Sequence, residues 1–159
     1  ERGVSIARLD SLTNAWPRQS TEELGWVFRG YRLDARRRPT FLYALPGLEI
    51  SDTPEPVAAG DGKPARLKRT LTIRQASGAA VQASPPFYYR VERDPGLEVV
   101  GTGDGTVWRF RTKDGLTLSI EPPKGAQPFL RDSEGEKELL VPLEPGVEGG
   151  AVLTIHYEW

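Results

Sequence analysis

The feature that most constrains this chain is a two-residue alternation of apolar and polar side chains, carried in short runs that turn residues separate. The alternation is clearest in residues 26–33, 67–74 and 106–120. Within the last of these, Asp114-Gly115 divides two alternating runs and supplies the positive φ that a tight hairpin needs. Because successive side chains of a strand point to opposite faces, each run predicts a strand with one buried face.

No segment shows the periodicity of an amphipathic helix, and the 17 Gly and 14 Pro fall mostly between the alternating runs. We therefore expect an all-β fold: an antiparallel β-sandwich, jelly-roll-like, with about nine or ten short strands. Residues 1–24 are expected to form an N-terminal lead-in segment, and residues 25–159 a single β-sandwich domain. Residues 52–65 hold three Pro and two Gly, which predicts a surface loop.

The residue types on which many enzymes rely are scarce in this chain. It has no Cys, no Met and a single His, His156. This composition excludes disulfides, thiolate metal sites, a Cys nucleophile and Cys-linked haem, and a Ser-His-Asp triad would depend on His156 alone. We therefore expect no cofactor and no metal, and we favour a binding or structural module over an enzyme.

Charge and hydropathy also restrict the partners. The net charge of −1 favours no nucleic-acid partner, and no apolar run is long enough to predict a membrane span. Five arginines gather between Arg29 and Arg38, but strict alternation places Arg29 and Arg32 on opposite faces of their strand. We interpret Arg36 to Arg38 as a solvated turn that could pair with acidic groups of the C-terminal half or of a partner.

Two further motifs have ordinary interpretations. The glycine-rich stretch 101–105 precedes a strand-like run, whereas a phosphate loop leads into a helix, so a turn is the better interpretation. The acidic stretch 132–136 lacks the spacing of a calcium loop, so we interpret it as a solvated turn.

Aromatic residues form the most informative set. Flat aromatic faces stack on sugar rings while neighbouring Arg, Asp or Glu side chains bond the sugar hydroxyls, although a β-sandwich core also takes large aromatics. The aromatic candidates include Tyr89 and Trp159. The candidate ligand-binding surface selected from the sequence comprises Trp26, Arg29, Tyr31, Arg32, Tyr88 and Trp108.

One segment resembles a known family. Residues Phe28-Arg29-Gly30-Tyr31-Arg32-Leu33-Asp34, followed by Arg38-Pro39-Thr40-Phe41-Leu42-Tyr43, are similar to a segment of large secreted bacterial proteins of planctomycete and verrucomicrobial type. Those proteins combine c-type cytochrome domains with sorbosone- or glucose-dehydrogenase-like β-propellers. Weaker similarities follow at residues 48–52, 69–73, 137–142 and 157–159.

The resemblance implies a periplasmic or extracellular location, other domains of a longer redox protein as partners, and a role near sugar oxidation. The haem sites of that family need a Cys-x-x-Cys-His segment, which this chain lacks. We therefore expect a non-catalytic accessory module that acts in domain or partner contact, with carbohydrate as a candidate ligand. The alternative is a sugar-active β-sandwich enzyme that uses carboxylates such as Glu98 or Asp104 with His156.

Overall fold

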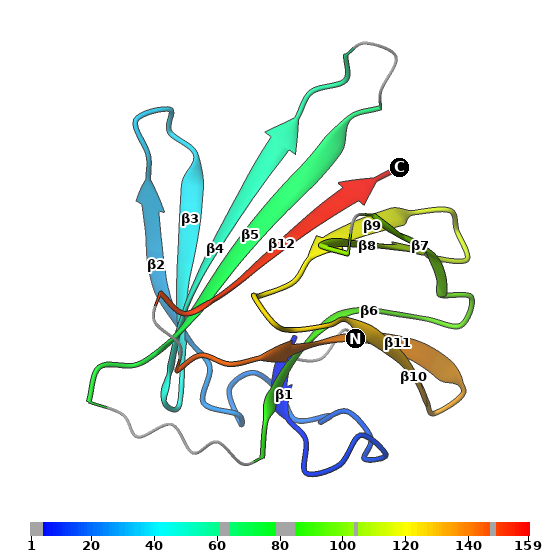
Figure 1. The fold of residues 1–159 in the computed structure, drawn as a ribbon. Helices are drawn as coiled ribbons and strands as arrows, with labels where there is room; N and C mark the ends of the chain where they lie inside the picture. The colour runs from blue at the N-terminus through cyan, green and yellow to red at the C-terminus, as the bar shows by residue number, and fades with distance from the viewer. Residues whose placement is uncertain (1–4, 61–63, 79–84, 104, 147–148) are drawn as a thin grey trace.

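The computed structural model describes residues 5–60, 64–78, 85–103, 105–146 and 149–159. These residues form two antiparallel β-sheets that pack face to face, and they contain no helix, so the expected all-β sandwich is confirmed (Figure 1). The described strands are β1 (Ile6–Arg8), β2 (Val27–Leu33), β3 (Pro39–Leu45), β4 (Leu48–Val57), β5 (Arg66–Gln75), β6 (Phe87–Asp94), β7 (Glu98–Gly103), β8 (Val107–Arg111), β9 (Thr117–Glu121), β10 (Phe129–Ser133), β11 (Glu136–Leu143) and β12 (Ala151–Glu158).

The larger sheet has eight strands in the order β2-β3-β4-β5-β12-β9-β8-β7. It consists of two meanders, β2 to β5 and β7 to β9, which the C-terminal strand β12 joins by pairing with β5 on one side and β9 on the other. The smaller sheet has four strands in the order β1-β6-β11-β10. Strands β2 and β7 are therefore the two edges of the larger sheet.

The core lies between the two sheets and is formed by the alternating apolar positions of the sequence. Along part of β4, β5 and β12, apolar residues two positions apart are buried, for example Leu71 and Ile73 in β5. The opposite wall comes from β1, β6 and β11. The buried core residues are Ile6, Leu48, Ile50, Leu71, Ile73, Phe87, Tyr89, Leu97, Phe110, Leu118, Ile120, Leu139, Val141, Leu143, Ala151, Leu153 and Ile155.

The N-terminal segment is attached to the smaller sheet. Strand β1 pairs with β6, and the segment that follows packs Leu9 and Trp16 on the outer face of this sheet against Leu140. Beside them, Arg90 lies over the ring of Trp16, with its guanidinium carbon 4.6 Å from the ring centroid. Residues 5–16 thus add a second, smaller apolar cluster behind the sandwich.

The β2–β3 hairpin extends beyond the part of the larger sheet that the smaller sheet covers (Figure 1). No residue of β2 or β3 belongs to the buried core, and in β2 every residue but Gly30 is exposed. Tyr43 and Leu45 of β3 pack against the edge of the core but are only partly buried. One end of the larger sheet therefore presents both of its faces to solvent.

The structure corrects two sequence expectations. The described residues form twelve strands instead of nine or ten, because β10 was not recognised in the sequence and β1 lies in the segment expected to be a lead-in. Residues 52–57 belong to β4 and not to a loop, although they include Pro54 and Pro56. Proline lacks the N–H that a central strand donates. Strand β4 accepts both because β3 pairs with it only as far as Asp52, and beyond this point only β5 is its partner.

Candidate binding surfaces on the β2–β3 hairpin

A β-bulge in β2 decides which side chains share a face. Phe28 is opposite Tyr43 and Gly30 is opposite Leu42, so Arg29 is an extra residue between two paired positions. Gly30 has φ of +102°, which residues with a side chain rarely adopt. The bulge shifts the alternation, so Arg29 and Arg32 line the same groove. The expectation that these two arginines lie on opposite faces was therefore wrong.

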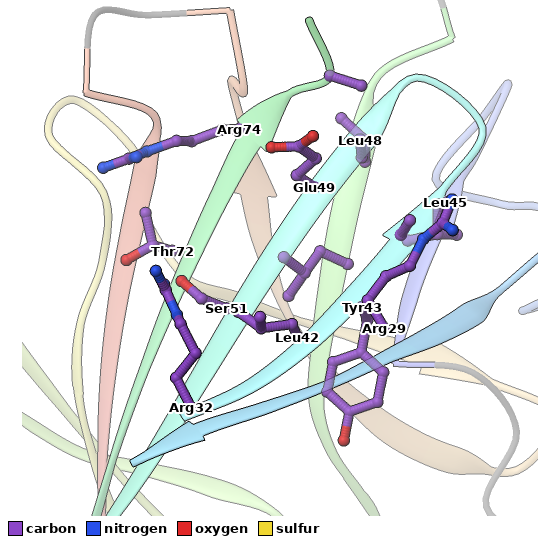
Figure 2. Close-up of a pocket in the computed structure, with 13 residues that line it drawn as sticks. Arg29, Arg32, Leu42, Tyr43, Leu45, Leu48, Glu49, Ser51, Thr72 and Arg74 are labelled. Atoms are coloured by element: carbon purple, nitrogen blue, oxygen red, sulfur yellow. The ribbon is translucent and has the colours of Figure 1, made fainter. Parts of the chain in front are cut away.

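The groove lies on the outer face of β2 to β5, away from the smaller sheet, and has a volume of about 550 Å³. Figure 2 shows Arg32 reaching from β2 over β3 toward Ser51 and Thr72, while Arg74 extends from β5 at the far side. Glu49 lies between these arginines and the β3–β4 turn. The outer face thus combines three guanidinium groups with one carboxylate and two hydroxyls.

The inner face of the same hairpin carries aromatic side chains. Trp26 contacts Tyr43 edge-on with 6.2 Å between ring centroids, and Tyr43 contacts Phe28 at 5.5 Å. Further along the hairpin, Tyr31 contacts Phe41 at 6.4 Å. Phe28 and Tyr31 are 57% and 61% exposed, so the row continues into solvent beyond the core. We call these five residues the aromatic row.

The inner end of the aromatic row opens on a cavity of about 230 Å³ at the margin of the sandwich. Asp52 and Arg69 form its polar wall: Arg69 Nη2 donates to Asp52 Oδ2 at 2.7 Å, and Arg69 Nε donates to the same carboxylate. Arg69 Nη1 donates to the hydroxyl of Tyr89 at 3.0 Å. Trp26 also lines the cavity, and its buried Nε1–H has no hydrogen-bond partner among the described residues.

The environment of this cavity shifts the titration of its polar groups. Burial raises the pKa of Tyr89, and the opposing charge of Arg69 only partly offsets this effect. Burial likewise raises the pKa of Tyr157, which also lies near Arg69. For Arg69, burial acts to lower the pKa, but the hydrogen bonds and charge of Asp52 outweigh it and the net shift is upward. Both tyrosines are therefore neutral at physiological pH, and Arg69 keeps its positive charge in the salt bridge with Asp52.

The other aromatic candidates lie elsewhere. Tyr88 is on the outer face of the smaller sheet, where it contacts Phe129 edge-on at 6.1 Å. Trp108 packs against the core from β8, and Tyr89 is a core residue. Of the six residues selected from the sequence, the structure brings Trp26, Arg29, Tyr31 and Arg32 to the β2–β3 hairpin, on its two faces, and leaves Tyr88 and Trp108 apart.

The residues of the enzymatic alternative do not form a common site among the described residues. His156 lies on the outer face of β12, with Nε2 3.3 Å from Glu121 Oε1, and lines none of the cavities described above. Glu98 is on β7, three positions from β12 in the strand order, which corresponds to about 14 Å at the usual strand spacing. Asp104 lies outside the described residues.

The acidic stretch 132–136 is the tip of the β10–β11 hairpin. Glu134 has φ of +54° and Gly135 +81°, the two positive values that a type I′ turn requires. Two of its carboxylates form ion pairs with arginines: Glu134 pairs with Arg18, and Glu136 pairs with Arg93. Within the described part of the chain, no three His, Asp or Glu side chains are grouped as metal ligands would be. That part also contains no helix suited to crossing a membrane.

Sequence reasoning missed several residues of the two surfaces. Phe28, Phe41 and Tyr43 complete the aromatic row, and Asp52 and Arg74 line the inner cavity and the outer groove. The phenylalanines and tyrosines of residues 28–43 lie in two alternating runs on either side of a predicted turn. Pairing these two runs as a hairpin would have identified the aromatic residues that face each other. Asp52 was hidden because it falls in a segment that was interpreted as a loop.

Comparisons with protein-family models, with curated proteins and with solved structures found no match for this chain.

Proposed function

We propose that this chain is a non-catalytic accessory module that binds an uncharged carbohydrate on the inner face of the β2–β3 hairpin. The observation that carries the proposal is the aromatic row, which runs from solvent-exposed Tyr31 and Phe28 to a polar cavity. Sugar rings present C–H faces that stack on aromatic rings and hydroxyls that need hydrogen-bond partners. The row offers the first kind of contact and the cavity offers the second.

The polar groups of the cavity favour an uncharged ligand. Asp52 and Arg69 neutralise each other through two-pronged hydrogen bonds, so neither charge is left for a charged ligand to match. The Nε1–H of Trp26 is a donor that lacks an acceptor, and a sugar hydroxyl or ring oxygen supplies one. A volume of about 230 Å³ suits one sugar residue at the end of a chain, with further residues along Phe28 and Tyr31.

The setting is proposed from the resemblance described above. The module would belong to a longer redox protein, periplasmic or extracellular, and would hold a carbohydrate near domains that oxidise sugars. Contact with another domain of that polypeptide is a second candidate role, favoured by exposed Val99 and Val100 on the edge strand β7. The coding sequence around this chain tests the setting: a secretion signal and a Cys-x-x-Cys-His segment are expected in the same reading frame.

Binding is tested on a glycan array, followed by calorimetry with the neutral oligosaccharides that bind. Tyr31→Ala is expected to weaken binding about tenfold, because a stacked ring is worth roughly 1–1.5 kcal/mol. Trp26→Phe keeps an aromatic ring in the cavity but removes the N–H donor, and should weaken binding by a similar factor. Trp159→Ala serves as the matched control, since Trp159 is exposed and lies outside the row. Absence of binding to every neutral glycan, or equal losses in all three variants, would overturn the proposal.

A further inference from the structure

We propose that the outer groove is a second binding site, specific for an acidic oligosaccharide that carries carboxylate or sulfate groups. The site is formed by Arg29, Arg32 and Arg74, with Glu49, Ser51 and Thr72 beside them. It uses the opposite face of the hairpin from the aromatic row, and its ligand belongs to a different chemical class. The inference therefore does not depend on the proposed function.

The arginines of the groove differ from most other strand arginines in their partners. Seven arginines elsewhere make ion pairs with carboxylates: Arg18, Arg38, Arg66, Arg69, Arg90, Arg93 and Arg131. Within the described residues, the side chains of Arg29 and Arg32 have neither an ion pair nor a hydrogen bond, and the side chain of Arg74 donates only to the carbonyl of Gly149. Glu49 makes no ion pair with any of them, although it pairs with Arg74 across the β4–β5 ladder. Three cations thus surround the groove with one carboxylate, so the groove has a net positive charge.

The bulge in β2 creates this arrangement. Without the extra residue, strict alternation would direct Arg29 away from Arg32. The bulge returns both side chains to the outer face, where Arg32 extends over Leu42 toward Ser51 and Thr72 (Figure 2). Bulges commonly redirect side chains at binding sites. The positive φ of Gly30 also supports a role for the bulge in this arrangement, because the backbone there adopts a conformation that only glycine takes readily.

The chemistry of the groove selects an acidic sugar chain over an acidic peptide. The groove lies over the face of a sheet, where the backbone groups are used in the strand ladder, so a peptide backbone would find few partners there. A sugar brings hydroxyls that Ser51, Thr72 and Glu49 can bond. Guanidinium groups bind carboxylate and sulfate oxygens through paired hydrogen bonds. The volume of about 550 Å³ exceeds that of the inner cavity and suits more than one sugar residue.

Calorimetry with oligogalacturonate and with a sulfated heparin oligosaccharide tests the proposal at low and at physiological salt. Neutral malto-oligosaccharide and poly-glutamate of similar length are the comparison ligands. We expect an acidic glycan to bind more tightly than both comparison ligands, with an affinity that falls as salt rises. Binding of poly-glutamate as tight as that of the best acidic glycan would assign the groove to acidic proteins instead and overturn the proposal, as would no binding of either acidic glycan.

Variants locate the site. Arg32→Ala and Arg29→Ala are each expected to weaken binding about tenfold or more, and Arg32→Lys should give an intermediate loss because lysine keeps the charge without the planar pair of donors. Arg36→Ala is the matched control, since Arg36 is an exposed arginine of the β2–β3 turn and does not line the groove. All three positions are exposed, so thermal unfolding of the four variants should be unchanged. A loss in Arg36→Ala equal to that in Arg32→Ala would show binding to general positive charge and would contradict the assigned site.

Discussion

Arg131 and Glu138 face each other across the β10–β11 pair and form a buried ion pair, with Arg131 Nη2 2.6 Å from Glu138 Oε2. Glu138 is 1% exposed, and its other oxygen accepts a hydrogen bond from Arg90 at 2.7 Å. Arg131 Nη1 also donates to the carbonyls of Leu12 and Asn14. The N-terminal segment is therefore fastened to the smaller sheet by a buried carboxylate and two largely buried arginines.

Glu138→Gln is expected to destabilise the protein strongly. Removing the carboxylate leaves two largely buried guanidinium groups without their counter-charge, and breaking such a buried pair costs about 3–5 kcal/mol. Urea denaturation measures the change in the free energy of unfolding. Glu136→Gln is the control, because Glu136 pairs with Arg93 at a partly exposed site and should cost less than about 1 kcal/mol. Equal costs for the two variants would contradict this account.

Gly30→Ala tests the bulge. A Cβ at this position meets no atom within 4 Å, so the cost comes from the positive φ alone and should be about 1–3 kcal/mol. Because relief of this strain would move Arg29 or Arg32, the variant should also weaken binding of acidic oligosaccharides. Gly101→Ala is the control: Gly101 lies in the bulged strand β7 with open space around it and without a positive φ. Urea denaturation of both variants measures the loss of stability, and calorimetric titration with acidic oligosaccharides measures the loss of binding.

Pro54→Thr combined with Pro56→Thr tests whether the prolines protect an open strand edge. Both lie in the part of β4 that β3 no longer pairs with, and each substitution adds an N–H donor to that strand. Unpaired strand edges recruit other strands, so we expect self-association that grows with protein concentration. Sedimentation at several protein concentrations measures this self-association. Pro95→Thr, a substitution in the β6–β7 turn, is the control. An equally monomeric double variant would argue against a protective role.

Tyr89→Phe tests how ionisation of this buried tyrosine lowers the stability of the fold at alkaline pH. The pKa of Tyr89 is raised in the folded state, so at high pH the unfolded chain loses this proton first and binds fewer protons than the folded chain. The stabilisation is present below the ordinary tyrosine pKa of about 10 and is lost as pH rises above it.

The variant should therefore show a shallower loss of stability above about pH 10, by at most about 1.4 kcal/mol per pH unit. Tyr157 contributes in the same direction, so the loss should be reduced and not abolished. Tyr31→Phe, at an exposed tyrosine, should keep the slope of the unsubstituted protein. Denaturation at a series of alkaline pH values provides the measurement, and identical slopes for Tyr89→Phe and Tyr31→Phe would refute the assignment.

Local alternation and turn chemistry were sufficient to predict the fold class. The β8–β9 hairpin follows from two alternating runs around Asp114-Gly115, and Gly115 has the expected positive φ of +89°. Strand β3 likewise follows from residues 40–45, one residue shorter than the observed strand. Strand β10 was missed because Phe129 and Leu130 are followed at once by polar residues, and the turn at Glu134-Gly135 was interpreted only for its charge.

The candidate surfaces were predicted only in part, since a face is defined by register. Trp26 and Tyr31 were selected from the sequence and do lie on one face, but their partners Tyr43 and Phe41 are set by the pairing of β2 with β3. Tyr88 and Trp108 were selected from the sequence for the same reason, their aromatic side chains, yet they pack against two different apolar clusters. Aromatic identity alone does not distinguish a platform from a packed side chain.

The sequence by itself determined that this chain forms short antiparallel strands, because alternation and turn residues act over a few neighbouring positions. It also excluded cysteine chemistry. Only the tertiary structure decided that Arg29 and Arg32 share a groove, that residues 52–57 are strand, and that Glu138 is buried between two arginines. Each of these depends on where a partner strand begins, ends or slips by one residue, and such pairing is set by contacts between segments far apart in the chain.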